Sequence, residues 1–127
     1  MSIKFNVVKR GNPAKPEAAR KFYPSIQSSG RMTVRQLAEK ASQMSTLSTM
    51  DMMAAIESFL TIVPQELADG KIVELGDFGN FWLRSSAEGV DEPERVRGDQ
   101  ITSLIPRFMP GKQFKRVLGA AEFEKLS

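Results

Sequence analysis

The chain begins with two short stretches in which apolar and polar residues alternate, as they do in half-buried strands. Residues 3–9 form the first stretch and residues 22–27 the second, and the segment 10–17 between them is rich in turn-forming Gly, Asn and Pro. The two stretches are therefore expected to pair as a β-hairpin with an exposed loop. Pro24 has no backbone N–H to donate, so its strand is expected at the edge of a sheet.

Helical spacing replaces this alternation after Gly30. Thr33 and Gln36 have the spacing of a capping box, which predicts the start of a first helix with its apolar residues on one face. A second start signal at residues 48–51 precedes a longer helix whose apolar surface is wider than one stripe. The surplus is more than one layer of structure would cover, and it predicts a partner subunit. The residues that widen the stripe are Met50, Met52, Phe59 and Ile62.

The second half of the chain predicts strands and a protruding segment. Residues 71–84 have the β-branched and aromatic content of two strands joined around Gly76 to Gly79, and residues 104–108 return to a strand. The stretch between these strands is polar and charged, so it is expected to protrude. Residues 110–112 then open a last short helix. This order of elements predicts an α+β fold.

Composition removes several classes of function. The sequence contains no Cys and no His, so disulfides, thiolate chemistry and the commonest general base and metal ligand are missing. The N-terminus has no long apolar run, which predicts neither a signal peptide nor a membrane anchor and favours the cytoplasm. We therefore expect no enzyme activity, cofactor, metal or small-molecule substrate. The only close acidic group that a nuclease could use lies at residues 91–94.

Charge is unevenly distributed along the chain. Residues 1–40 contain nine Lys/Arg against two Asp/Glu, residues 41–100 four against eleven, and residues 101–127 five against two. Both ends are thus basic and the middle is acidic. Composition alone leaves two interpretations open, a solvated surface of uneven charge and a pair of basic regions that bind a polyanion.

Two motifs give the order of elements a more specific meaning. They are Val-Glu-Leu-Gly-Asp-Phe-Gly-Asn-Phe at residues 73–81 and Ile-Pro-Arg-Phe-Met-Pro-Gly-Lys at residues 105–112. Together they resemble the bacterial HU/integration host factor family, whose hairpin carries Phe-Gly-x-Phe and whose returning strand ends in Val/Ile-Pro-x-Phe-x-Pro-Gly-Lys. The resemblance covers residues 33–119, and the hairpin of residues 1–30 is similar to an N-terminal extension in HU-like proteins of Bacteroides-type bacteria.

The resemblance implies a single HU-like domain over residues 1–127, with two helices, an antiparallel sheet, a protruding β-arm and a short C-terminal helix. It further implies a histone-like, nucleoid-associated protein that binds double-stranded DNA as a homodimer, largely without sequence preference, and can bend it. In the family each arm follows the DNA minor groove. Residues 84–107 would be this arm, and its phosphate contacts would be Arg84, Arg95, Arg97 and Arg107. Lys112 and Lys115, near a helix start, are further candidates for phosphate contacts.

The expected arm departs from the basic arm of the family. Residues 84–107 hold four basic and five acidic residues, and Pro93, near the expected tip, lies among carboxylates that repel a phosphate backbone. Whether Pro93 is a wedge between base pairs or a turn proline stays open. A rival hypothesis therefore remains, a structural or protein-interaction module that keeps the HU-like fold and has lost tight DNA binding.

The N-terminal hairpin is rich in the basic residues that the expected arm lacks. We include Lys9 and Arg10 among the candidate DNA contacts for this reason. The neighbouring Phe22 and Tyr23 could stack on bases, but we expect them to pack the hairpin onto the body of the protein. The cations of this cluster are Lys9, Arg10, Lys15, Arg20, Lys21 and Arg31.

Overall fold

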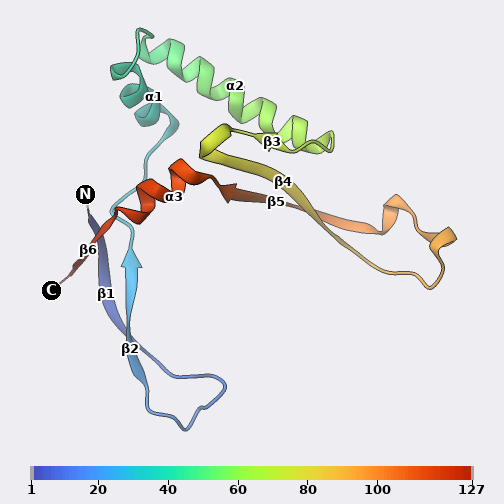
Figure 1. The fold of residues 1–127 in the computed structure, drawn as a ribbon, viewed down its shortest axis with the longest axis horizontal. Helices are drawn as coiled ribbons and strands as arrows, with labels where there is room; N and C mark the ends of the chain where they lie inside the picture. The colour runs from blue at the N-terminus through green and yellow to red at the C-terminus, as the bar shows by residue number, and fades with distance from the viewer. Residues whose placement is uncertain (1, 127) are drawn as a thin grey trace. The chain divides into compact units, whose positions relative to one another are not determined.

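The computed structural model describes residues 2–126, and over this range the chain is a mixed α+β structure with three α-helices and two three-stranded sheets. It divides into two compact units (Figure 1). One unit contains the residues up to Thr33 together with those from Val117 on, and the other contains Val34–Arg116. Each unit has a sheet of its own, and the first unit combines the predicted hairpin with residues from the other end of the chain.

The N-terminal unit is built on the predicted hairpin. Strands β1 (Ser2–Arg10) and β2 (Lys21–Gln27) pair antiparallel, with Arg10 opposite Lys21 at the loop end. The strand order β2-β1-β6 places β2 at an edge, as Pro24 predicts. The third strand, β6 (Glu122–Lys125), runs parallel to β1. The sequence pattern did not predict this strand.

Side chains as well as backbone groups hold β6 on β1. Lys4 forms an ion pair with Glu124, and the same carboxylate accepts a hydrogen bond from Ser2 Oγ at 3.1 Å. The Leu126 N–H donates to the Phe5 carbonyl at 2.9 Å. The hydrogen bonds from Lys4 and then Ser2, with the positive charge of Lys4, lower the pKa of the Glu124 carboxyl.

The two predicted helices open the second unit. Helix α1 (Val34–Gln43) begins directly after Thr33, and α2 (Thr49–Ala68) begins after Ser48. The Ser48 side chain accepts a hydrogen bond from the Asp51 N–H at 3.1 Å, which satisfies one of the free donors at the helix start. Both helices therefore begin where the sequence predicts them.

The apolar surface of α2 is largely uncovered in the single chain, as the width of its stripe predicts. Among residues 2–126, only Ala38 and Leu67 are buried apolar residues, whereas Met50 and Phe59 are 81% and 61% exposed. The chain exposes 11071 Å², against roughly 6,700 Å² for a compact monomer of this mass. Part of this excess belongs to the two long hairpins and part to apolar faces without a partner.

The second sheet contains β3 (Val73–Glu74), β4 (Gly79–Ala87) and β5 (Ile101–Pro110) in that order, all antiparallel. A short 3-10 turn, η1 (Gly76–Phe78), joins β3 to β4. Gly79 has φ 147°, and a Cβ at this position would meet the Met109 carbonyl oxygen and the Phe108 ring. Only glycine fits there, which explains this part of the Phe-Gly-x-Phe motif.

An aromatic cluster joins the two motifs. The Phe108 ring lies 4.8 Å from Phe81 and 5.5 Å from Phe78, measured between centroids, and Phe114 of α3 (Lys112–Gly119) lies 5.4 Å from Phe108. These rings fix the start of α3 against the sheet. Phe78 is only partly covered by these contacts and stays 47% exposed. The exposed part borders an apolar groove.

This groove lies between α2 and the second sheet and has a volume of about 580 Å³. It is open to solvent in the single chain. Its lining is apolar throughout and comprises Phe59, Leu60, Val63, Pro64, Leu75, Phe78 and Phe81.

Candidate nucleic-acid interface

Strands β4 and β5 form a two-stranded ribbon that leaves the helices of its unit, and we call this ribbon with its tip the arm (Figure 1). Their pairing extends from Gly79↔Pro110 to Ala87↔Ile101, with an irregularity between Ser86 and Ala87. The pairing thus includes residues on both sides of the range 84–107, in which the arm was predicted. Residues 88–100 make the tip.

The ladder register sorts the arm residues onto two faces. Residues directly opposite each other in an antiparallel pair share a face, and neighbours along a strand alternate. Phe81 and Phe108 are opposite each other and belong to the aromatic cluster. Trp82 and Arg107 are the next pair and lie on the other face, which Arg84 shares. The two arginines are diagonal neighbours and both are exposed.

Arg84, Arg97 and Arg107 have no ion-pair partner among residues 2–126. Arg95 differs, because its Nε lies 3.4 Å from Glu92 Oε2. The structure thus brings Arg84 and Arg107 together on the ribbon and places Arg95 and Arg97 separately in the tip. One of the four predicted arm cations is already paired within its own chain.

The tip is folded into short turns that start at Pro93. These are the 3-10 turns η2 (Pro93–Arg95) and η3 (Gly98–Gln100). The Gln100 side chain closes the tip, because its Nε2 donates to the Glu88 backbone carbonyl at 2.7 Å and its Oε1 accepts from the Arg97 backbone N–H at 2.5 Å. Pro93 occupies the first position of η2, where its fixed φ suits the turn. This position fits a turn proline.

The start of α3 carries a second basic group next to the arm base. Lys112 and Lys115 are exposed, whereas Phe114 between them faces the aromatic cluster. Arg116, one helical turn beyond Lys112, is also exposed and shares its side of the helix. The sequence interpretation missed Arg116, although its i, i+4 spacing from Lys112 was visible.

The N-terminal hairpin separates two candidates that are adjacent in sequence. Lys9 is opposite Phe22, and its Nζ lies 5.6 Å from the centre of that ring, a cation–π contact. Arg10 is opposite Lys21 on the other face. Phe22 and Tyr23 are 68% and 45% exposed within their own unit's sheet, and their packing onto the body of the protein stays a prediction.

Residues 2–126 contain no group of three carboxylates close enough to hold a metal ion. The acidic residues 91–94 therefore do not form such a group. None of the described helices is long and apolar enough to cross a membrane.

Comparisons with known proteins agree with the motifs. Over residues 1–125 the sequence matches the HU-HIG family, described as an HU domain fused to wHTH, Ig, or Glycine-rich motif. Integration host factor subunit beta of Marinobacter nauticus is 33% identical over 88 residues, which cover 66% of this chain and 89% of the relative. DNA-binding protein HU of Thermotoga maritima is 27% identical over 86 residues, or 66% of this chain and 96% of the relative.

A solved structure shares the fold over nearly the whole chain. The crystal structure of a Bacteroides vulgatus protein superimposes with a TM-score of 0.66 over 98% of this chain, at 13% identity. The chain spans about half of that protein, 48% of its length. The sequence match over residues 1–125 and the relatives above 30% identity show the family directly: the chain belongs to the bacterial HU/integration host factor family, as a member of its HU-HIG group.

Proposed function

We propose that the chain is a histone-like architectural protein that binds duplex DNA as a homodimer, mainly through phosphates and with little sequence preference. The named relatives, integration host factor subunit beta and DNA-binding protein HU, support the choice of DNA. The Val34–Arg116 unit would be one half of an HU-like dimer. A DNA partner places the protein at the nucleoid in the cytoplasm.

The observation that carries the proposal is the two-sided register of the arm. One face holds Phe81 and Phe108 and packs into the protein, and the opposite face presents Arg84 and Arg107 to solvent beside Trp82. Neither of these arginines has an acidic partner in residues 2–126, so both are free to replace counterions on a phosphate backbone. Because phosphate contacts carry no sequence information, the binding is largely non-specific.

Lys112 and Lys115 extend this basic face at the base of the arm. The start of α3 also provides backbone N–H groups that have no partner within the helix. We assign Arg95 and Arg97 a weaker share, because Arg95 is paired with Glu92 and the tip as a whole is acidic. Bending follows if two arms of a dimer hold one duplex from both sides.

The apolar groove supports the homodimer. A large, entirely apolar surface in a water-soluble chain is normally covered, and an obligate interface resembles a core cut in half. Phe59 is the residue of the groove best suited to a test, because it lines the groove from α2 and is 61% exposed. A second copy of the chain would bring the same apolar surface, and pairing the two surfaces would remove both from water.

Sedimentation of the protein with a short duplex tests the proposal. We expect two chains in free solution and two chains on each duplex. Phe59→Glu should give single chains with at least tenfold weaker binding, because one arm instead of two then holds the duplex. Ser58→Glu adds the same charge on the neighbouring residue outside the groove and should leave the dimer intact. A wild-type chain that sediments as a monomer and binds no DNA would contradict the proposal.

A second candidate function is favoured by the acidic tip. A module that keeps the fold but binds another protein would use the tip, where Glu92 neutralises Arg95. In that case replacing Arg84 and Arg107 would leave DNA affinity unchanged, and the tip would bind a protein with a basic surface.

A further inference from the structure

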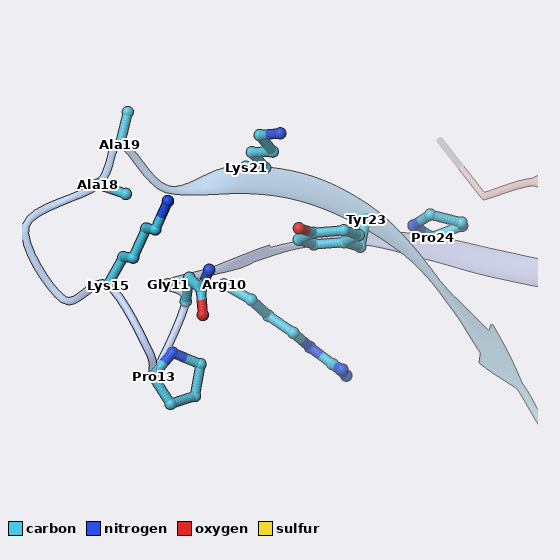
Figure 2. A pocket seen from close by; sticks show the side chains of 10 residues that line it. Arg10, Gly11, Pro13, Lys15, Ala18, Ala19, Lys21, Tyr23 and Pro24 are labelled. Atoms are coloured by element: carbon cyan, nitrogen blue, oxygen red, sulfur yellow. The ribbon is translucent and has the colours of Figure 1, made fainter.

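A hollow of about 790 Å³ lies inside the loop of the N-terminal hairpin (Figure 2). The hollow is lined by Arg10 at the end of β1, Lys21 at the start of β2 and Lys15 in the loop. Tyr23, two residues after Lys21 in β2, also lines it. Figure 2 shows Lys15 extending across the mouth of the loop, whereas Arg10 extends along the strands beneath Tyr23. The cations are therefore spread along the hollow and do not converge on one point.

The loop that makes the hollow is held by its own hydrogen bonds. The Asn12 side chain accepts from the Ala14 N–H at 2.9 Å, and the Asn12 carbonyl accepts from the Lys15 N–H at 3.0 Å. The Lys15 carbonyl in turn accepts from the Ala18 N–H at 3.0 Å. These consecutive turns fix the position from which Lys15 projects. The hollow is thus a folded feature of the loop sequence.

The charge of the hollow is uncompensated. Glu17 is the only acidic residue between Lys9 and Lys21. Arg10, Lys15 and Lys21 form no ion pair with any residue of the range 2–126, in contrast to Arg95 in the arm tip. A concave surface lined by charges of one sign concentrates its field and attracts the opposite charge. The hairpin loop is therefore a cationic site without ion pairs among residues 2–126.

We propose that this hollow is a second DNA-binding site, which takes a stretch of phosphate backbone along Arg10, Lys15 and Lys21. Tyr23 lies on the same strand face as Arg10 and Lys21 and is 45% exposed, so its ring can pack against a deoxyribose or an end base. A volume of about 790 Å³ and cations that point in different directions suit a chain of phosphates better than one small anion. The proposal rests on the proposed function for the identity of the polymer.

On this proposal, cations of the N-terminal hairpin supply phosphate contacts that the acidic arm lacks. Lys9 has no place in this site, since it lies on the opposite face over Phe22. The hairpin contact is therefore formed by one face of the loop end of β1 and β2. Its contribution to binding adds to that of the arm when both touch the same duplex.

The test compares two triple variants of the full chain by fluorescence anisotropy with a labelled duplex over a range of salt concentrations. The variant that combines Arg10→Gln, Lys15→Gln and Lys21→Gln should bind with a shallower salt dependence. The magnitude of the slope of log affinity against log salt should fall by about 2 to 3 for each hairpin that touches the duplex. Arg35→Gln, Lys40→Gln and Lys71→Gln remove the same charge from the other unit, and the slope should fall by less than about 1. Equal slopes for the two variants would overturn the proposal.

Tyr23 provides a local readout, because it is the only tyrosine of the chain. A fluorinated tyrosine should give one fluorine NMR signal that shifts when duplex DNA is added, and the shift should vanish in the hairpin triple variant. An unchanged signal during saturable DNA binding would overturn the hairpin site and leave the proposed function standing. If inorganic phosphate alone shifts the signal and added DNA then changes it no further, the hollow is a small-anion site and the proposal is overturned. No DNA binding at low salt would remove both proposals.

Discussion

Trp82 and Arg107 are opposite each other in the ladder of β4 and β5, and their side chains share the face turned away from the aromatic cluster. Arg84, two residues after Trp82, is on the same face. This places the only tryptophan of the chain beside two arginines that form no ion pair within residues 2–126. The proposed DNA contact of the arm therefore has its own optical reporter.

The first prediction concerns this face. Arg84→Gln with Arg107→Gln should weaken duplex binding and lower the salt slope by about 1 for each phosphate that is no longer neutralised. Trp82 fluorescence, excited selectively, should change when DNA binds to the wild type and change less in the variant. Arg35→Gln, which removes a cation paired with Glu39 at 3.5 Å, is the control. Equal affinity of the double variant and the wild type would exclude the arm face as a DNA-binding surface.

The second prediction concerns the acidic tip. Asp91→Asn, Glu92→Gln and Glu94→Gln together should tighten duplex binding about tenfold at low salt, because they remove repulsion from phosphates and release Arg95 from Glu92. The gain should fade as salt is added. Glu57→Gln with Asp51→Asn and Glu39→Gln makes the same charge change on the helices and serves as the control. Tighter binding in both variants alike would show a net-charge effect without a role for the tip.

The third prediction concerns Gly79 and Gly111, one glycine from each motif. Gly79→Ala or Gly111→Ala should destabilise the fold by roughly 2–4 kcal/mol, because a Cβ would meet backbone or ring atoms with no room to move. At Gly79 these are the Met109 carbonyl and the Phe108 ring, and at Gly111 the backbone of Asp77. Gly89→Ala, where nothing lies within 4 Å, is the matched control. Thermal unfolding measures the difference, and similar midpoints for all three variants would contradict the packing described here.

The fourth prediction concerns pH and strand β6. Since Lys4 lowers the pKa of Glu124, the ionised carboxylate stabilises the pairing of β6 with β1 above the ordinary glutamate pKa, and this contribution disappears as pH falls through the lowered value. Backbone NMR signals of Glu122–Lys125 should therefore lose their strand shifts on acidification. Glu124→Gln should show the loosened state already at neutral pH, whereas Glu122→Gln should behave like the wild type. Acid-independent signals in the wild type would refute the contribution.

The local patterns of the sequence predicted most of the elements. The hairpin, helices α1 and α2 and the returning strand lie where alternation, helical spacing and the two motifs place them. The exposed apolar surface of α2 was also predicted, because a stripe wider than one layer is visible in the sequence alone. Each of these features depends on residues close together along the chain.

Features that depend on distant residues were not predicted. Strand β6 has only four residues and pairs parallel with β1 from the other end of the chain, so no local pattern indicates its partner. The hairpin register sets the cross-strand partners, Phe22 for Lys9 and Lys21 for Arg10, whereas strand alternation alone already separates Lys9 from Arg10. The hollow at the loop also depends on how the turns at Asn12 and Lys15 place the side chains.

The most direct test of the account is the salt dependence of duplex affinity for the wild-type protein, measured with two DNA fragments of unrelated sequence. We expect log affinity to fall linearly with log salt, with a slope steeper than about −4 and nearly equal for both fragments, since each phosphate contact contributes about 0.9. A flat dependence on salt, or tight binding to one fragment alone, would contradict attachment through phosphates.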